Sequence, residues 1–208
     1  NSLSKQPGIS LPLPEIIELI HPWEADIVDL ISRSLNETSG VLKIQGAGSG
    51  ALLTGDLEPA GWGWLKKHHE DLRSDVLKFP HHGAWKNGDA HDLLGTVDPS
   101  IVIISVGTTG SRYGHPNSHV FDALAQRPDI RLLCTQVTRQ CANAISRKHS
   151  AIIKQFKENA AQTTGFFAEQ NGCPCAGTVI IELGESARIL QPSLQFHREQ
   201  IIKHHFSE

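Results

Sequence analysis

Strand-length apolar runs alternate with helix-like segments through the middle of the chain, and this alternation constrains the fold more than any other feature. Each run is short, is rich in Val, Ile and Leu, and stops at Gly, Pro or a polar residue, as buried strands do. A chain in which such strands alternate with helices forms a layered α/β domain. The runs are ALLT, DVLKF, IVIISV, IRLLCT and, after a long gap, GTVIIEL.

The segments between these runs have the periodicity or the boundary residues of helices. IVIISV is apolar throughout, so we expect both faces of that strand to be covered. Upstream, EIIELIHP predicts a strand that ends at Pro22, and VLKIQGAGSGALLT predicts a hairpin with a glycine-rich turn. The predicted helices are PAGWGWLKKHHEDL, DAHDLLGTVDP, HPNSHVFDALAQRPD, ANAISRKHSAIIKQFKENAAQ and LQFHREQIIKHHF.

A residue that can bind metals or move protons follows three of the predicted strands. Asp56 follows ALLTG, the pair His81 and His82 follows DVLKFP, and His115 comes shortly after IVIISVG. In α/β layers, side chains at the carboxyl ends of strands gather into sites. Carboxylate and imidazole groups bind zinc or manganese, and imidazole also serves as a general acid. The three strand ends therefore predict one shared site.

Each of these residues also has an interpretation that needs no ligand. Asp56 is well suited to cap the turn or helix that follows it, because its carboxylate accepts backbone hydrogen bonds. A His-His pair in a loop is compatible with simple surface polarity. The joint pattern of three strand ends favours a functional site over these separate explanations.

The motifs LLTGDLE, DVLKFPHHG, IVIISVG and YGHP, in this order, resemble the metallo-β-lactamase-fold hydrolases. Within that fold they are most similar to the hydrolase domain of ComEC-type DNA-uptake proteins. The resemblance covers residues 36–135 and resumes at GTVIIEL. It implies an αββα sandwich, with one or two zinc or manganese ions that activate a water for attack on a phosphodiester or another ester.

The resemblance also implies roles for individual residues. Asp56 matches the aspartate that bridges the metal ions, and His115 matches the terminal metal histidine of the tRNase Z-like and phosphodiesterase branches. His81 or His82 is then the phosphate-contacting acid, while the opposite assignment, with His81 as a metal ligand, stays open. The implied function is that of a metal-dependent hydrolase, specifically a phosphodiesterase or nuclease.

The main ligand cluster of that family, an H-x-H-x-D-H loop, is absent from the 208 residues. The chain also contains no Met, so we expect Asn1 to be an internal residue of the encoded protein. The chain then corresponds to the C-terminal half of the sandwich, over residues 1–135 and 176–208. We expect the missing N-terminal half, a partner subunit or a second copy in a homo-oligomer to complete the fold and the metal site.

Four cysteines lie near the two ends of the segment 136–175, which we expect to be a helical insertion in the domain. If the strands on either side of the insertion are neighbours, the four sulfurs start close together. A structural zinc bound by four thiolates would then close the long loop. Free thiols or a disulfide are the alternatives, and the apparent lack of an export signal favours reduced thiols over a disulfide. The cysteines are Cys134, Cys141, Cys173 and Cys175.

Charge and hydropathy narrow the possible function classes. The net charge is −3 and no basic tail is present, so a polyanionic substrate such as a nucleic acid would have to be bound locally. No apolar run is long enough to span a membrane and no secretory signal is recognisable, so we expect a cytoplasmic protein. Two alternatives to a phosphodiesterase stay open. One is a hydrolase of small esters or lactams on the same fold, and the other is a non-catalytic half-domain that binds a partner.

Overall fold

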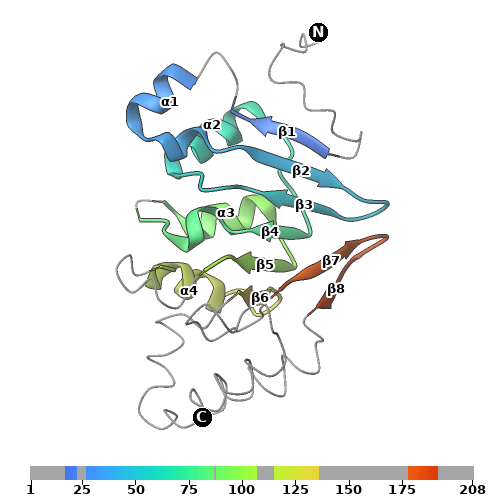
Figure 1. Cartoon of the computed structure of the whole chain (residues 1–208). Coiled ribbons are helices and arrows are strands. Elements are labelled where there is room, and N and C mark those ends of the chain that lie inside the picture. The colour runs from blue at the N-terminus through green and yellow to red at the C-terminus, as the bar shows by residue number, and fades with distance from the viewer. Residues whose placement is uncertain (1–16, 23–26, 87, 107–114, 136–177, 192–208) are drawn as a thin grey trace, which may run out of the picture.

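The computed structural model describes residues 17–22, 27–86, 88–106, 115–135 and 178–191. These residues form a six-stranded sheet, a separate two-stranded hairpin and four α-helices (Figure 1). The predicted mixed α/β layering is therefore confirmed at this level. The segment predicted as a helical insertion and the predicted C-terminal helix lie outside the described residues.

The main sheet combines an antiparallel half and a parallel half. Strands β1, β2 and β3 pair antiparallel, and strands β3 to β6 pair parallel. The hairpin predicted around GAGSG is confirmed, with Leu42 opposite Leu53 and Gln45 opposite Gly50. In spatial order the strands are β1 (Ile17–His21), β2 (Val41–Gln45), β3 (Gly50–Leu53), β4 (Val76–Lys78), β5 (Ile101–Ile104) and β6 (Arg131–Cys134).

Two of the helices begin with residues that suit a helix start. Helix α2 begins with Pro59, whose missing amide hydrogen costs nothing at that position. Asp89 caps α3, because its carboxylate accepts hydrogen bonds from the backbone amides of His91 and Asp92. The α-helices are α1 (Ile27–Arg33), α2 (Pro59–His68), α3 (Ala90–Val97) and α4 (Ser118–Ala125), and the short helical turns are η2 (Leu35–Thr38) and η3 (Pro80–Gly83).

Alternate residues of the parallel strands face two different apolar layers, as the two-residue repeat of a strand requires. Leu77 and Val102 belong to the larger core, which also contains the buried side chains of α2, α3 and α4. Val76 and Ile101 belong to a smaller cluster on the other face of the sheet. Both faces of β5 are thus covered by apolar side chains, as its uninterrupted apolar sequence predicts.

The smaller cluster is completed by the hairpin of β7 (Ile180–Leu183) and β8 (Ala187–Gln191). The turn of this hairpin lies beside the β2–β3 turn (Figure 1), where the amide of Gly48 donates to the carbonyl of Gly184 at 2.8 Å. A side chain at Gly46 would lie 2.6 Å from the carbonyl oxygen of Leu183, so this close approach requires glycine.

The sequence predicts β7 but not β8. The predicted strand GTVIIEL is confirmed as β7, whereas the segment ARILQ, which forms β8, has no predicted counterpart. Ala187 and Ile189 are half-buried and alternate with exposed Arg188 and Leu190. That two-residue alternation is the signal by which the strand could have been found.

Candidate functional site

The parallel strands bring the three predicted loops to one edge of the sheet. Ala51 of β3 pairs with Val76 of β4, and Val76 pairs with Ile101 of β5. Because these strands are in register and parallel, the loops that follow their carboxyl ends leave the sheet on the same side. We call the group of residues at this edge the rim; its members are Asp56, Lys78, His81, His82 and His115.

Asp56 lies in the turn after β3. Gly55 before it has φ of 54°, a left-handed conformation that glycine adopts without strain. The Oδ1 atom of Asp56 lies 3.5 Å from Nε2 of His82 and 3.8 Å from Nζ of Lys78. Helix α2 has Glu58 at its N-cap position, so Asp56 does not occupy the helix cap that is its alternative role.

His82 faces Asp56 with one ring nitrogen and the backbone with the other. Its Nδ1 lies 2.5 Å from the carbonyl oxygen of Ser105, which accepts hydrogen bonds only. Nδ1 therefore carries the proton, and Nε2 is directed at the carboxylate. The side chains of Asp56 and His82 are 43% and 44% exposed, so a ligand can reach both.

His81 adopts an unusual backbone and contacts a carboxylate that sequence reasoning did not single out. Its φ of 45° is left-handed, as is the φ of 54° at His82. The amide of His81 donates to the carbonyl of Gly55, which ties this loop to the turn that carries Asp56. Nδ1 of His81 lies 3.2 Å from Oε1 of Glu58. Left-handed non-glycine residues cost free energy and often occur at functional sites.

His115 joins the rim from the loop beyond β5. Its ring centroid lies 5.7 Å from that of His81. The pKa of His115 is lowered, chiefly because burial disfavours the imidazolium and also because positive charge on the nearby His81, His82 and Lys86 repels a further positive charge. The loop is locked to the histidine pair, because the amide of Asn117 donates to the carbonyl of Gly83 at 2.9 Å.

Lys78 is a rim residue that sequence reasoning missed. It is the last residue of β4, and its ammonium donates to the carbonyl of Gly55 beside Asp56. Burial lowers the pKa of Lys78, and the carboxylate of Asp56 partly opposes this effect. The segment KFPHHG could have pointed to Lys78, because this lysine ends an otherwise apolar strand three residues before His81.

Asp56 and His82 have the donor atoms and the separation to bind one zinc or manganese ion, which is an alternative to a proton-transfer role for Nε2 of His82. Adjacent ligands of a tetrahedral ion with bonds of about 2.0–2.2 Å lie roughly 3.4 Å apart, close to the observed separation. However, among the described residues no group of three or more His, Cys, Asp or Glu side chains is arranged to hold a metal ion. The ammonium of Lys78 also lies beside the same carboxylate oxygen. The described residues therefore do not make a metal site by themselves.

The predicted structural zinc site lies mostly beyond the described part of the chain. Cys134 ends β6 and is 3% exposed within the larger core. Cys141, Cys173 and Cys175 lie outside the described residues. Whether the four thiols share an ion is a prediction that stays open.

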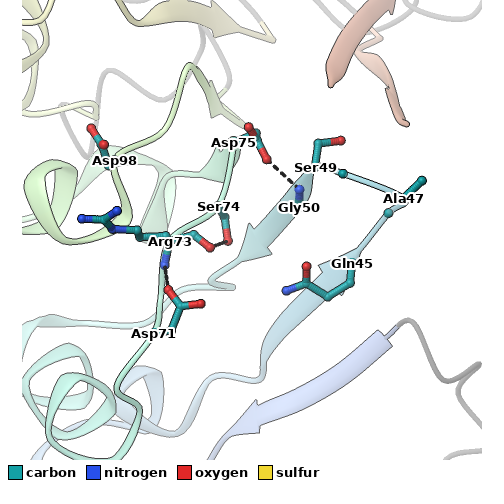
Figure 2. Close-up of a pocket in the computed structure, with 11 residues that line it drawn as sticks. Gln45, Ala47, Ser49, Gly50, Asp71, Arg73, Ser74, Asp75 and Asp98 are labelled. Carbon is teal, nitrogen blue, oxygen red and sulfur yellow. Dashed lines mark hydrogen bonds between the residues drawn. The ribbon is translucent and has the colours of Figure 1, made fainter. Parts of the chain in front are cut away.

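A hollow of about 400 Å³ lies at the other end of the parallel strands. It is lined by the β2–β3 turn and by residues 71–75, just before β4. Figure 2 shows Asp75 in this hollow, with its carboxylate bonded to the amide of Gly50 at 2.8 Å. Because Asp75 and Gly50 lie at the amino ends of β4 and β3, the hollow is separate from the rim.

The comparisons with known proteins relate the chain to one part of a much longer protein. No family model matches the chain, and no solved structure matches it. Over 102 residues, 49% of the chain, it is 37% identical to ComE operon protein 3 of Bacillus subtilis (strain 168). The chain spans only 13% of the length of that protein. Of the helices that the structure describes, none has the length and apolar character needed to cross a membrane.

Proposed function

We propose that the chain contributes half of the active site of a metal-dependent hydrolase with the metallo-β-lactamase fold, acting as a phosphodiesterase or nuclease. The rim is the part of the site that this chain supplies. The remaining metal donors come from outside the described residues, in another segment of the encoded protein, a partner subunit or a second copy. Nucleic acid or another phosphodiester is the proposed substrate.

The observation that carries this proposal is the meeting of three separate strand-end loops at the rim. Asp56 contacts His82 at 3.5 Å, and His81 lies against His115. The resemblance of LLTGDLE, DVLKFPHHG and YGHP to the ComEC-type hydrolase domain supports the same assignment. The identity with part of ComE operon protein 3 supports a relation to that protein, which is the premise of this resemblance.

The residues of the rim are suited to bind a phosphoryl group and to handle a proton. The Lys78 ammonium is a hydrogen-bond donor for phosphate oxygens, and the free Nε2 of a histidine becomes one when the ring is protonated. His82 has Nδ1 bound to the Ser105 carbonyl, which orients its Nε2 toward the open side of the site. From that position His82 is the better placed member of the pair to exchange a proton with a substrate near Asp56.

A non-catalytic role is the second candidate, and a specific contact favours it. The Lys78 ammonium lies 3.8 Å from Oδ1 of Asp56, where it partly neutralises the carboxylate without a metal. A half-domain built in this way could bind a partner or a phosphorylated ligand with no hydrolysis. Metal binding separates the two candidates, because only the hydrolase needs an ion beside Asp56.

The decisive experiment uses the protein expressed from its natural gene. It is incubated with bis-p-nitrophenyl phosphate, DNA, RNA and a β-lactam, each with Mn²⁺ or Zn²⁺ and again with a chelator. We expect metal-dependent cleavage of the phosphodiesters. Asp56→Asn and His82→Gln should each lower the rate about 100-fold or more.

The matched control is His91→Gln, which changes an exposed histidine on α3 and should leave the rate unchanged. Cleavage of the lactam alone would contradict the phosphodiesterase proposal and favour a hydrolase of small esters or lactams on the same fold. Absence of cleavage together with absence of Mn²⁺ or Zn²⁺ binding would favour the binding module.

A further inference from the structure

We propose that Glu58 is a positioning residue that fixes the ring orientation and the tautomer of His81. Oε1 of Glu58 lies 3.2 Å from Nδ1 of His81, and the two side chains are 30% and 24% exposed. The consequence for hydrolysis rests on the proposed function, whereas the effect on the His81 ring does not.

The carboxylate of Glu58 is available to His81 because Glu37, and not Glu58, caps α2. Glu58 occupies the N-cap position, yet within the described structure its side chain accepts no capping bond from the helix. Those amides are satisfied by Glu37, which accepts from Ala60 at 3.3 Å and from Gly61 at 2.5 Å. A carboxylate at an N-cap that does not cap the helix is unusual, and here it turns toward the rim.

The Glu58 carboxylate is itself held in place from the opposite direction. Nδ2 of Asn36 donates to Oε1 of Glu58 at 3.2 Å, so the oxygen that faces His81 is anchored to η2. The backbone of His81 is fixed as well, because its amide is bonded to Gly55 and its carbonyl to the amide of Ala84. With both ends fixed, the contact determines how the His81 ring turns.

The contact also selects the protonation pattern of the ring. At 3.2 Å a lone pair on Nδ1 would be repelled by the carboxylate oxygen of Glu58, so the contact favours a hydrogen on this nitrogen. Neutral His81 is therefore held as the Nδ1–H tautomer, with the lone pair of Nε2 on the side of the ring away from Glu58. A lone pair in that position can accept a proton or a hydrogen bond from a ligand at the rim.

The direct test is ¹⁵N NMR of the histidine rings in the protein expressed from its natural gene at pH 8.5, about two pH units above the ordinary imidazole pKa of about 6.5. The His81 signals are assigned by comparison with His81→Gln. We expect His81 to be mainly the Nδ1–H form in the wild type and to shift toward the Nε2–H form in Glu58→Ala. Glu58→Gln keeps an oxygen acceptor and should retain the Nδ1–H form.

Glu70→Ala, a change at an exposed glutamate just after α2, serves as the control and should leave the His81 signals unchanged. Urea unfolding of each variant checks that the chain is folded. In the hydrolysis assay, Glu58→Ala should lower kcat about 10- to 100-fold while KM changes little. If folded Glu58→Ala keeps the wild-type His81 tautomer, the proposal is wrong. Failure of all hydrolysis in the wild type would count against the proposed function and leave the tautomer result standing.

Discussion

At the scale of single residues, Gly83 is the position on which the two histidine loops depend. It has φ of 77°, and a side chain at this position would place Cβ 2.5 Å from Cβ of Pro116. The carbonyl of Gly83 also accepts from the amide of Asn117. The loop of His81 and His82 and the loop of His115 can therefore approach each other only because residue 83 has no side chain.

We expect Gly83→Ala to destabilise the protein by about 2–4 kcal/mol, because it combines a left-handed alanine with a close contact to Pro116. Urea unfolding measures the change. The matched control is Gly95→Ala in α3, where the added Cβ meets no atom within 4 Å. That change should stabilise the protein by roughly 0.5–1 kcal/mol, because alanine is the better helix former. Equal stability of the two variants would contradict the role given to Gly83.

At the scale of elements, α2 connects the core to the rim through its first turn. Trp62 and Leu65 bury one side of the helix in the larger core. Glu37, which is 5% exposed, reaches from η2 to bond the first amides of the helix. The start of α2 thereby places Glu58 beside His81, so helix capping and rim geometry are coupled.

We expect Glu37→Ala to cost about 2 kcal/mol of unfolding free energy, because it leaves buried amides at the start of α2 without their acceptor. Glu70→Ala removes a carboxylate that is exposed and should change the unfolding free energy by less than about 0.5 kcal/mol. Chemical denaturation followed by tryptophan fluorescence measures both. A loss at Glu37 no larger than the loss at Glu70 would show that the cap is unimportant.

A second element-scale prediction concerns pH and the contact between α2 and α3. Burial raises the pKa of Asp92, but hydrogen bonds from Lys66 and Trp62 and the charge of Lys66 outweigh it, so the net shift is downward. A lowered pKa in the folded state means that the ionised Asp92 stabilises the protein above its unfolded pKa of about 3.9. This stability is lost as the pH falls through the folded pKa.

Asp92→Asn should therefore reduce the unfolding free energy at pH 7 by at most about 1 kcal/mol, since the ion pair is partly exposed and screened. The difference between wild type and variant should shrink below about pH 4 and vanish once Asp92 is protonated in the folded protein. Urea unfolding from pH 2.5 to pH 7 provides the comparison. A difference that grows toward low pH would have the wrong sign.

Most of the described strands and helices could be predicted from the sequence. The rim could be predicted only in part, for a different physical reason. The strands of the parallel half are short, mostly apolar runs, so they can be identified from the local sequence pattern. Asp56, His81, His82 and His115 could be singled out because they follow such runs. Glu58 could not, because its contact with His81 depends on Glu37 capping α2, and that arrangement appears only after folding.

At the scale of the whole molecule, the part of the chain that the structure describes covers the two faces of the main sheet unequally. Three helices pack on one face, whereas the β7–β8 hairpin covers part of the other. The hairpin docks through the backbone contact between Gly48 and Gly184 and through the hydroxyl of Ser49, which donates to the Gly184 carbonyl at 3.1 Å. This docking joins a segment near residue 180 to one near residue 48.

We expect Gly46→Ala to push the hairpin away from the β2–β3 turn, because its Cβ would lie 2.6 Å from the carbonyl oxygen of Leu183. The cost should be about 1–3 kcal/mol, with faster amide hydrogen exchange in β7 and β8. Gly184→Ala lies at the same contact but its Cβ approaches no atom closer than 3.9 Å, so exchange should change little. Unchanged exchange in Gly46→Ala would show that the docking tolerates a larger separation.

The left-handed backbone of the histidine pair has a consequence for the history of the gene. Glycine and asparagine tolerate such a backbone best, so His81→Gly or His82→Gly should relieve strain while removing an imidazole. In a lineage whose product no longer hydrolyses anything, selection for stability would then favour glycine or asparagine at these two positions. Lineages that still depend on the reaction should keep both histidines and tolerate the lower stability that they impose.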